Sequence, residues 1–348
     1  MSPSKTSSPP EVLPGFACWV PLIVALVVWA VWTALMQSGA RWGLFADNWF
    51  MSVTMVFGSF VAGATSEGGG AVAFPVMTLG FDIAPDVARD FSLMIQSVGM
   101  TAASITIFAL RVRIVSHALV WASLGGAAGV ILGLEFIAPL LPPDHAKMLF
   151  TSTWLAFAFA LYWINRYRER EVHLGITHFL PRHALLLLGT GVVGGVISSI
   201  TGSGLDIATF SLLVLRLRIC ESVATPTSVV LMGGNALVGA LWQGNFGSAP
   251  LSAEAWDYWW CAAPVVVVGA PVGAWFIKTR SRHFMARLLY TTIGAQFFAA
   301  LFAVPLTPLL VLFSLAVLAA GVFFFDRMAR RGVRRLEWLS ETGKPPAA

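Results

Sequence analysis

Long runs of apolar residues, separated by short polar stretches, make up most of the chain. Eight of these runs approach the roughly 20 residues that a helix needs to cross the hydrocarbon core of a bilayer. They are Cys18–Met36, Phe91–Leu110, His117–Leu134, Met148–Ile164, Val223–Trp242, Tyr258–Ile277, Leu288–Val304 and Leu309–Phe325. The pattern predicts an all-α integral membrane protein in which each run is one transmembrane helix.

Two further apolar regions, Phe50–Gly80 and Ala184–Leu215, are too long for one crossing, and a glycine cluster interrupts each in its middle. Backbone that leaves helical geometry inside a membrane must be buried in protein or line a water-filled cavity. We therefore predict two re-entrant helical hairpins, each of which enters and leaves the membrane on one side. Hairpin halves that cross fully would change the number of spans but not the sidedness of the loops.

Composition and charge support a membrane protein. Only 11% of the residues are charged, whereas soluble domains carry about 25%, which excludes a soluble enzyme. With the N-terminus inside, 19 of the 22 Lys and Arg residues fall in inside loops or tails. Positive charge is retained on the cytoplasmic side, so we predict a multi-pass protein with both termini in the cytoplasm. This distribution explains the net charge of +5 without a nucleic-acid partner.

The same pattern divides the chain into segments. We predict a disordered cytoplasmic tail (1–16), a first transmembrane helix with an outer loop (17–49), a first repeat (50–165), a cytoplasmic loop (166–183), a second repeat (184–304), a last transmembrane helix (305–325) and a basic cytoplasmic tail (326–348). In that tail Arg327, Arg330, Arg331, Arg334 and Arg335 recur at three- and four-residue steps, which favours contact with anionic lipid. The sequence is also compatible with a homo-oligomer.

Cysteine and histidine give no sign of a metal or redox centre. The three cysteines are far apart and form no Cys-x-x-Cys pair, and no histidine has the spacing of a zinc motif. We expect neither a metal site nor a cofactor.

Acidic residues are more informative. With this topology Glu67 and Asp206 are the only Asp, Glu, Lys or Arg residues at membrane depth, and each lies at a glycine cluster. Ionisable residues inside a membrane are costly and usually functional. They are the first candidates for a site.

The two interrupted regions resemble each other. Gly58–Pro75 reads G-S-F-V-A-G-A-T-S-E-G-G-G-A-V-A-F-P, and Gly191–Asp206 reads G-V-V-G-G-V-I-S-S-I-T-G-S-G-L-D. Each precedes a span with the pattern Val-Ala-x-x-x-Ser, and three crossings separate the two, so the clusters enter from opposite sides. This is the inverted-repeat plan of secondary transporters. The alternative is that the glycines serve close helix packing alone.

These motifs resemble the sulfite exporter TauE/SafE family of bacterial membrane permeases, over roughly Phe50 to Phe325. The resemblance implies a permease rather than an enzyme, which exports a small sulfur-containing or organic anion, such as sulfite or an organosulfonate, across the bacterial inner membrane. Two features depart from the family pattern. Glu67 stands where the family usually has a small or apolar residue, and the second copy contains Ser203 and Asp206.

Short half-helices, Ala71–Gly80 and Leu205–Leu215, are expected to begin at the breaks. Helix starts offer unpaired N–H groups and the positive end of the helix dipole, which bind anions. Two starts near the midplane would form one site for a small anionic substrate. The candidate substrate-binding residues are Thr65, Ser66, Gly68, Gly69, Gly70, Thr201, Gly202, Ser203, Gly204, Gln96 and Asn235. For Gln96 and Asn235, helix–helix hydrogen bonding is an equal alternative.

A protonated carboxyl group can donate a hydrogen bond to an anion. We hypothesise that Glu67, and secondarily Asp206, binds a proton together with the substrate and so couples export to the proton gradient by alternating access. The alternatives are Na⁺ binding at the carboxylates, a cationic or zwitterionic substrate, and a polar vestibule in which Asp206 has no role. An anion channel and an intramembrane aspartyl protease are more remote, since the protease dyad requires two carboxylates that share one site.

Overall fold

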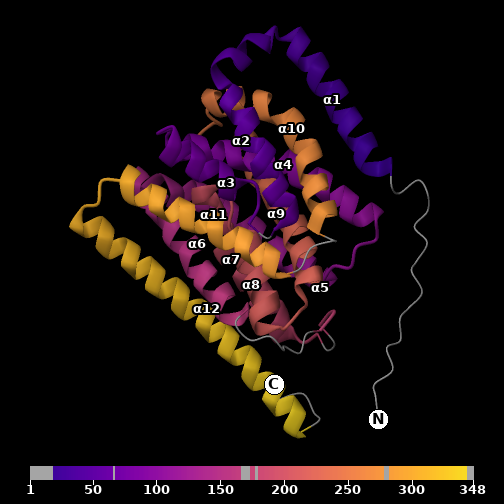
Figure 1. The fold of residues 1–348 in the computed structure, drawn as a ribbon, viewed down its shortest axis with the longest axis vertical. Helices are drawn as coiled ribbons and strands as arrows, with labels where there is room; N and C mark the ends of the chain where they lie inside the picture. Colours follow the sequence, from indigo (N-terminus) through magenta and orange to yellow (C-terminus); the bar gives the residue numbers. More distant parts are fainter. Residues whose placement is uncertain (1–18, 66, 166–172, 177–178, 278–281, 343–348) are drawn as a thin grey trace.

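The computed structural model describes residues 19–65, 67–165, 173–176, 179–277 and 282–342. Over these ranges the chain consists of helices joined by short turns, with one isolated β-bridge between His173 and Ile219, so the predicted all-α fold is confirmed (Figure 1). The α-helices are α1 (Val20–Ser38), α2 (Leu44–Ala64), α3 (Gly70–Pro75), α4 (Pro85–Ala109), α5 (Ser116–Leu132), α6 (Pro143–Asn165), α7 (Pro181–Thr201), α8 (Leu205–Ser211), α9 (Glu221–Asn245), α10 (Ala253–Ile277), α11 (Arg282–Ala303) and α12 (Pro308–Thr342).

Eight helices of the described chain are long and apolar enough to cross a membrane, which supports a multi-pass membrane protein. Six of them, α1, α4, α5, α9, α10 and α12, coincide with predicted spans. The other two are α2 and α7, the first arms of the interrupted regions, whereas the predicted spans in α6 and α11 are not among the eight. The apolar part of α11, Arg287–Ala303, is shorter than a full span.

Each interrupted region has one long arm and one short arm. Helices α2 and α7 both have 21 residues, about 31 Å at 1.5 Å per residue, which is enough to cross a bilayer. After each break, a short helix continues as a π-helical segment, η3 (Val76–Gly80) after α3 and η6 (Leu212–Arg216) after α8. The two half-helices therefore lie where they were predicted, but their partner arms are longer than half-helices. Re-entrant insertion of these hairpins stays a prediction.

The elements after the two breaks match one another closely. Helices α4 and α9 both have 25 residues and begin 136 positions apart. At the end of the π-helical segments, Ile83 N donates to Met77 O and Ile219 N donates to Leu213 O, both at 2.9 Å. This match extends the internal similarity beyond the glycine clusters.

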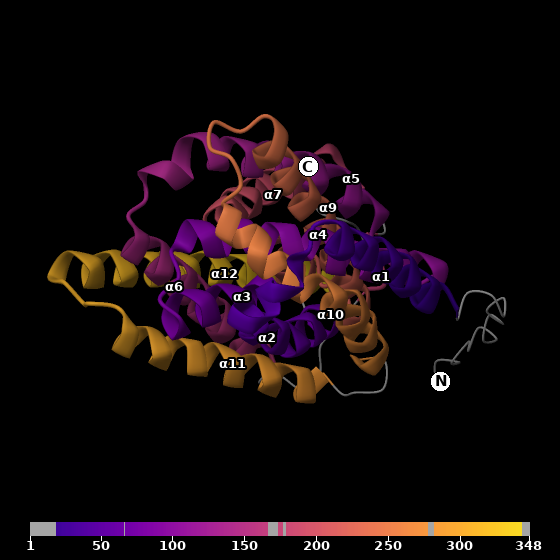
Figure 2. The same ribbon diagram turned by 90° about the horizontal axis from the view of Figure 1, so that it is seen from above.

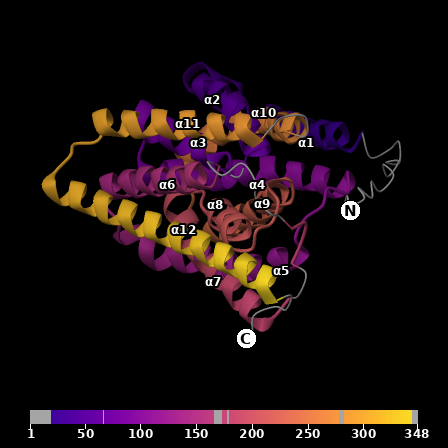
Figure 3. The ribbon, with the colours of Figure 1, turned by 60° about the horizontal axis from the view of Figure 1, so that its bottom comes forward.

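Helix packing follows the same correspondence. The first arm α2 lies along α10, and the first arm α7 lies along α5. In the middle, α4 packs against α9 with Gly233 facing Met100 and Gly239 facing Leu93, so these two helices run antiparallel. An antiparallel central pair is what an inverted repeat requires. In Figure 2, α1 extends toward the right edge of the molecule and α12 toward the left edge, and in Figure 3 α12 crosses the molecule diagonally.

Glycines make the α5–α7 and α2–α10 pairs very close. The α-carbons of Gly125 and Gly129 on α5 face the backbone of Leu188 and Val192 on α7, where a side chain would overlap the facing carbonyl groups. Gly63 faces Ala270 in the same way. Small residues permit such approach in membranes. Gly63 belongs to the first interrupted region and serves close packing here, whereas Gly125 and Gly129 lie outside both regions.

Candidate functional site

The two glycine breaks meet in the interior of the molecule. Ser203 Oγ, from the second break, donates a hydrogen bond to the backbone oxygen of Glu67 in the first at 2.9 Å. Gly68 (φ 72°), Gly202 (φ 75°) and Gly204 (φ 151°) have the positive φ that glycine accepts readily. Segments separated by more than 130 residues thus form one polar centre at the start of α8.

Gln96 connects this centre to α4. Its Nε2 donates to the backbone oxygen of Gly202 at 2.6 Å and to that of Ser92 at 2.9 Å. Gln96 thus lies beside the second break, and its role in substrate binding stays a prediction. Thr65 and Thr201 bond within their own breaks: Thr65 Oγ1 accepts from Glu67 N, and Thr201 Oγ1 donates to the backbone oxygen of Ser203. These two hydroxyls shape the backbone turns.

Glu67 is the unusual member of the centre. Its side chain is fully buried, and within the described residues neither carboxyl oxygen has a hydrogen-bond partner. Ser92 Oγ and Gln96 Oε1 are also buried without a partner there. Asp206 is close enough to interact with Glu67 electrostatically. A cluster of unsatisfied polar atoms in a native interior calls for a ligand, a water molecule or a proton.

Asp206 is also fully buried, but it has partners. Its Oδ1 accepts hydrogen bonds from Gly204 N and Ile207 N at 3.0 Å each. Ser198 Oγ accepts a third bond, from Leu205 N, at 3.1 Å. The donors at the start of α8 are therefore occupied by the protein's own side chains. The expectation of an open helix start is wrong for α8, because its own carboxylate caps it.

Of the remaining candidate residues, some lie next to the polar centre and others do not contact it. Gly69 precedes α3, and a Cβ at Gly70, the first residue of α3, would lie 2.8 Å from Gln96 Nε2, so glycine permits a close approach there. Asn235 is buried next to Gly126 of α5, but its amide has no hydrogen-bond partner within the described residues and does not bond to either break. Ser66 lies outside the described residues.

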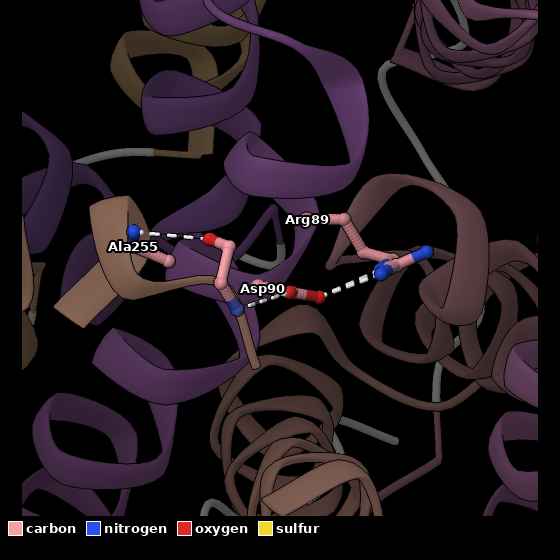
Figure 4. A network of polar contacts seen from close by, with 4 residues as sticks. Arg89, Asp90 and Ala255 are labelled. Atoms are coloured by element: carbon pink, nitrogen blue, oxygen red, sulfur yellow. Dashed lines mark hydrogen bonds and ion pairs between the residues drawn. The ribbon is translucent and has the colours of Figure 1, made fainter. Parts of the chain in front are cut away.

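A buried ion pair stands beside the centre and was not predicted. Arg89 and Asp90, assigned to an outer loop by the hydropathy pattern, are 9% and 2% exposed on the first turns of α4. Arg89 donates to Asp90 Oδ1 through Nε at 3.0 Å and Nη2 at 2.7 Å (Figure 4). A Cβ at Gly202 would lie 3.0 Å from the backbone oxygen of Arg89. Arg89 and Asp90 are therefore buried charges next to the second break, although the sequence pattern placed them in an outer loop.

Asp90 also joins two helices. Its Oδ2 accepts from Ser252 N at 3.2 Å, and Ser252 Oγ accepts from Ala255 N in the first turn of α10 at 3.0 Å (Figure 4). Hydropathy does not reveal this ion pair, because Arg89 and Asp90 lie just before an apolar run, where a loop is expected. The adjacent Arg-Asp dipeptide was the only available signal.

Replacing Asp90 with asparagine is expected to destabilise the protein by about 2 kcal/mol, since hydrogen bonds to charged groups contribute about 1.5–3 kcal/mol each. The neutral amide would leave Arg89 without its counter-charge. Thermal unfolding in detergent measures this change. Asp86→Asn, at an exposed position one turn earlier in α4, is the matched control, and equal stability of the two variants would contradict the prediction.

The described residues contain no group of three or more His, Cys, Asp or Glu side chains that would hold a metal ion. The polar centre instead offers hydroxyl, amide and carboxyl groups at the junction of two repeats. Such a set suits reversible binding of a small polar solute.

Comparison with known families gives one match. The model of the sulfite exporter TauE/SafE family covers residues 50–296, which run from α2 into α11 and include both glycine breaks. Helices α1 and α12 lie outside the match. Comparisons with curated proteins and with solved structures give no match.

Proposed function

The chain belongs to the sulfite exporter TauE/SafE family of membrane transporters, and we propose that it exports a small oxyanion, such as sulfite or an organosulfonate, together with protons. The observation that carries this proposal is the meeting of the two breaks around Glu67, whose carboxyl group is buried and has no hydrogen-bond partner among the described residues.

The substrate would lie between the first break and α4. There the hydroxyl of Ser92, the amide oxygen of Gln96 and the carboxyl of Glu67 are buried and have unused hydrogen-bonding capacity. A hydroxyl and a protonated carboxyl each donate one hydrogen bond to an anion's oxygen atoms. Gly68 and Gly70 approach Gln96 and Ser203 more closely than a residue with a side chain could, which brings the polar groups of the two breaks together.

Proton binding follows from the cost of burial. A buried carboxylate without hydrogen-bond donors is expensive to keep ionised, and the carboxyl of Asp206 lies near that of Glu67. An anion that enters this centre makes a second negative charge still less favourable. Glu67 therefore takes up a proton when the substrate binds and releases it when the substrate leaves. Substrate and proton then move together.

The antiparallel packing of α4 and α9 supports alternating access. If the two repeats exchange conformations about this pair, the centre opens to one side of the membrane and then to the other. A channel would instead need a continuous path past the same residues.

Transport in proteoliposomes tests the proposal. Labelled sulfite and methanesulfonate would each be offered to vesicles with no gradient, with a pH gradient and with a Na⁺ gradient. We expect accumulation above the equilibrium level with the pH gradient only. Accumulation with the Na⁺ gradient alone would assign coupling to Na⁺.

Two other outcomes would contradict the proposal. Movement that never exceeds the electrochemical equilibrium of the anion would identify a channel. No movement of either anion under any gradient would exclude these oxyanions, and a cationic or zwitterionic solute would then be the next substrate class to offer. Empty vesicles and vesicles with an unrelated membrane protein provide the background rate.

A further inference from the structure

A groove lies between α7 and α12, away from the polar centre. Its volume is about 470 Å³. Leu185 and Val193 of α7 form one wall, and Phe323 and Phe324 of α12 form the other. In Figure 3, α12 crosses the molecule on the side where α7 and α8 lie. Most of the surface in this groove is apolar, so it suits a hydrocarbon chain.

Three arginines line the same groove. Arg216 ends η6, and Arg327 and Arg331 are exposed residues of α12, four positions apart on one face. The guanidinium of Arg327 lies 5.4 Å from the ring centre of Phe323, which also lines the groove. No acidic residue is among those that line the groove. The groove therefore combines an apolar wall with a concentrated positive charge.

We propose that this groove binds one anionic phospholipid, with its phosphate between the three arginines and an acyl chain along the apolar wall. Guanidinium groups pair with phosphate oxygens through charge-assisted hydrogen bonds. The arginines fall on the side that the charge distribution assigns to the cytoplasm, where anionic lipids attract basic segments. This site differs from general attraction of the basic tail, because α7 and η6 supply half of it.

The position of the groove gives the lipid a structural role. Segment η6 completes the second hairpin, and α12 packs on it through Gly332, where a Cβ would lie 3.2 Å from the backbone oxygen of Arg216. A phosphate held by arginines of both elements joins α12 to the end of the hairpin. The family match ends before α12, so one wall of this groove lies outside the matched region.

Native mass spectrometry of the full chain in neutral detergent tests the proposal. The probes are phosphatidylglycerol, phosphatidylcholine and inorganic phosphate. The test variant carries Arg327→Gln and Arg331→Gln. The control is Arg330→Gln, on the same helix, because Arg330 pairs with Asp326 and does not line the groove. Thermal unfolding without added lipid verifies that each variant is folded.

We expect the wild type and Arg330→Gln to bind one phosphatidylglycerol at least tenfold more tightly than the double variant does. Phosphatidylcholine should bind weakly to all three. Equal phosphatidylglycerol binding by the double variant and the control would overturn the proposal. Displacement of the lipid by millimolar inorganic phosphate would overturn it too, since it would indicate a site for a free anion. The readout is independent of transport, so it stands apart from the function proposed above.

Discussion

Replacing Glu67 with glutamine is expected to abolish accumulation driven by a pH gradient, with a loss of at least tenfold relative to the wild type. Glutamine keeps the size of the side chain and can still donate a hydrogen bond to an anion, but it cannot bind or release a proton. Downhill exchange of the labelled anion should therefore persist. The measurement compares counterflow and gradient-driven uptake in the same proteoliposome preparation.

Asp47→Asn is the matched control for this variant. Asp47 lies on the first turn of α2, at the opposite end of the helix that leads to Glu67, and it is exposed. We expect it to retain both exchange and accumulation. Full pH-driven accumulation by Glu67→Gln would contradict proton coupling at this residue, whereas loss of exchange as well would show that Glu67 is needed for binding itself.

The two buried carboxylates have different surroundings, and this refines the coupling hypothesis. Asp206 accepts hydrogen bonds from the backbone of Gly204 and Ile207, so its carboxylate holds the start of α8 in place. Glu67 has no such bonds among the described residues. A carboxyl that is free of structural bonds can change protonation without unfolding its surroundings. Glu67 therefore stays the primary candidate for the coupling proton, and we propose a positioning role for Asp206.

Hydropathy alone was enough to identify most of the fold. Six predicted spans coincide with helices that can cross a membrane, and both glycine breaks lie within one or two residues of their predicted positions. The unequal arms of the hairpins were missed because α2 and α7 continue in helical geometry up to the break. A glycine cluster indicates where a helix ends, but it carries no information about how deep in the bilayer that end lies.

The sequence identified the two carboxylates at the glycine breaks but missed the ion pair beside them. Glu67 and Asp206 were found because a charge in an apolar run is conspicuous. Arg89 and Asp90 were missed because burial at the end of a span depends on a distant segment, the residues just before α10, where Ser252 donates its N–H to Asp90. Asn235 was included on residue type, and tertiary packing places it against α5 instead. Contacts between distant segments decide such cases.

A Gly191→Val substitution is expected to prevent stable folding, at a cost above about 3 kcal/mol, because overpacking of a tight interface commonly costs 1–3 kcal/mol even where neighbouring side chains can move. At Gly191 the nearest atoms belong to the backbone of α5, which cannot move as a single side chain can. A Cβ at Gly191 would overlap the backbone oxygen of Ala122 and would lie 2.9 Å from the backbone nitrogen of Gly126. Helix α7 would have to separate from α5, which would also shift the second break at the end of α7.

Gly189→Val on the same helix separates this effect from helix propensity. Gly189 is two positions away, and a Cβ added there would meet no atom within 4 Å, so both variants carry the same β-branched residue in one helix. We expect Gly189→Val to keep the wild-type melting temperature and gel-filtration profile in detergent, while Gly191→Val aggregates or melts far lower. Similar behaviour of the two variants would show that α5 and α7 are not held by glycine contacts. In that case the contact between α5 and α7 would not fix the position of the second break, because α7 could move away from α5 without loss of stability.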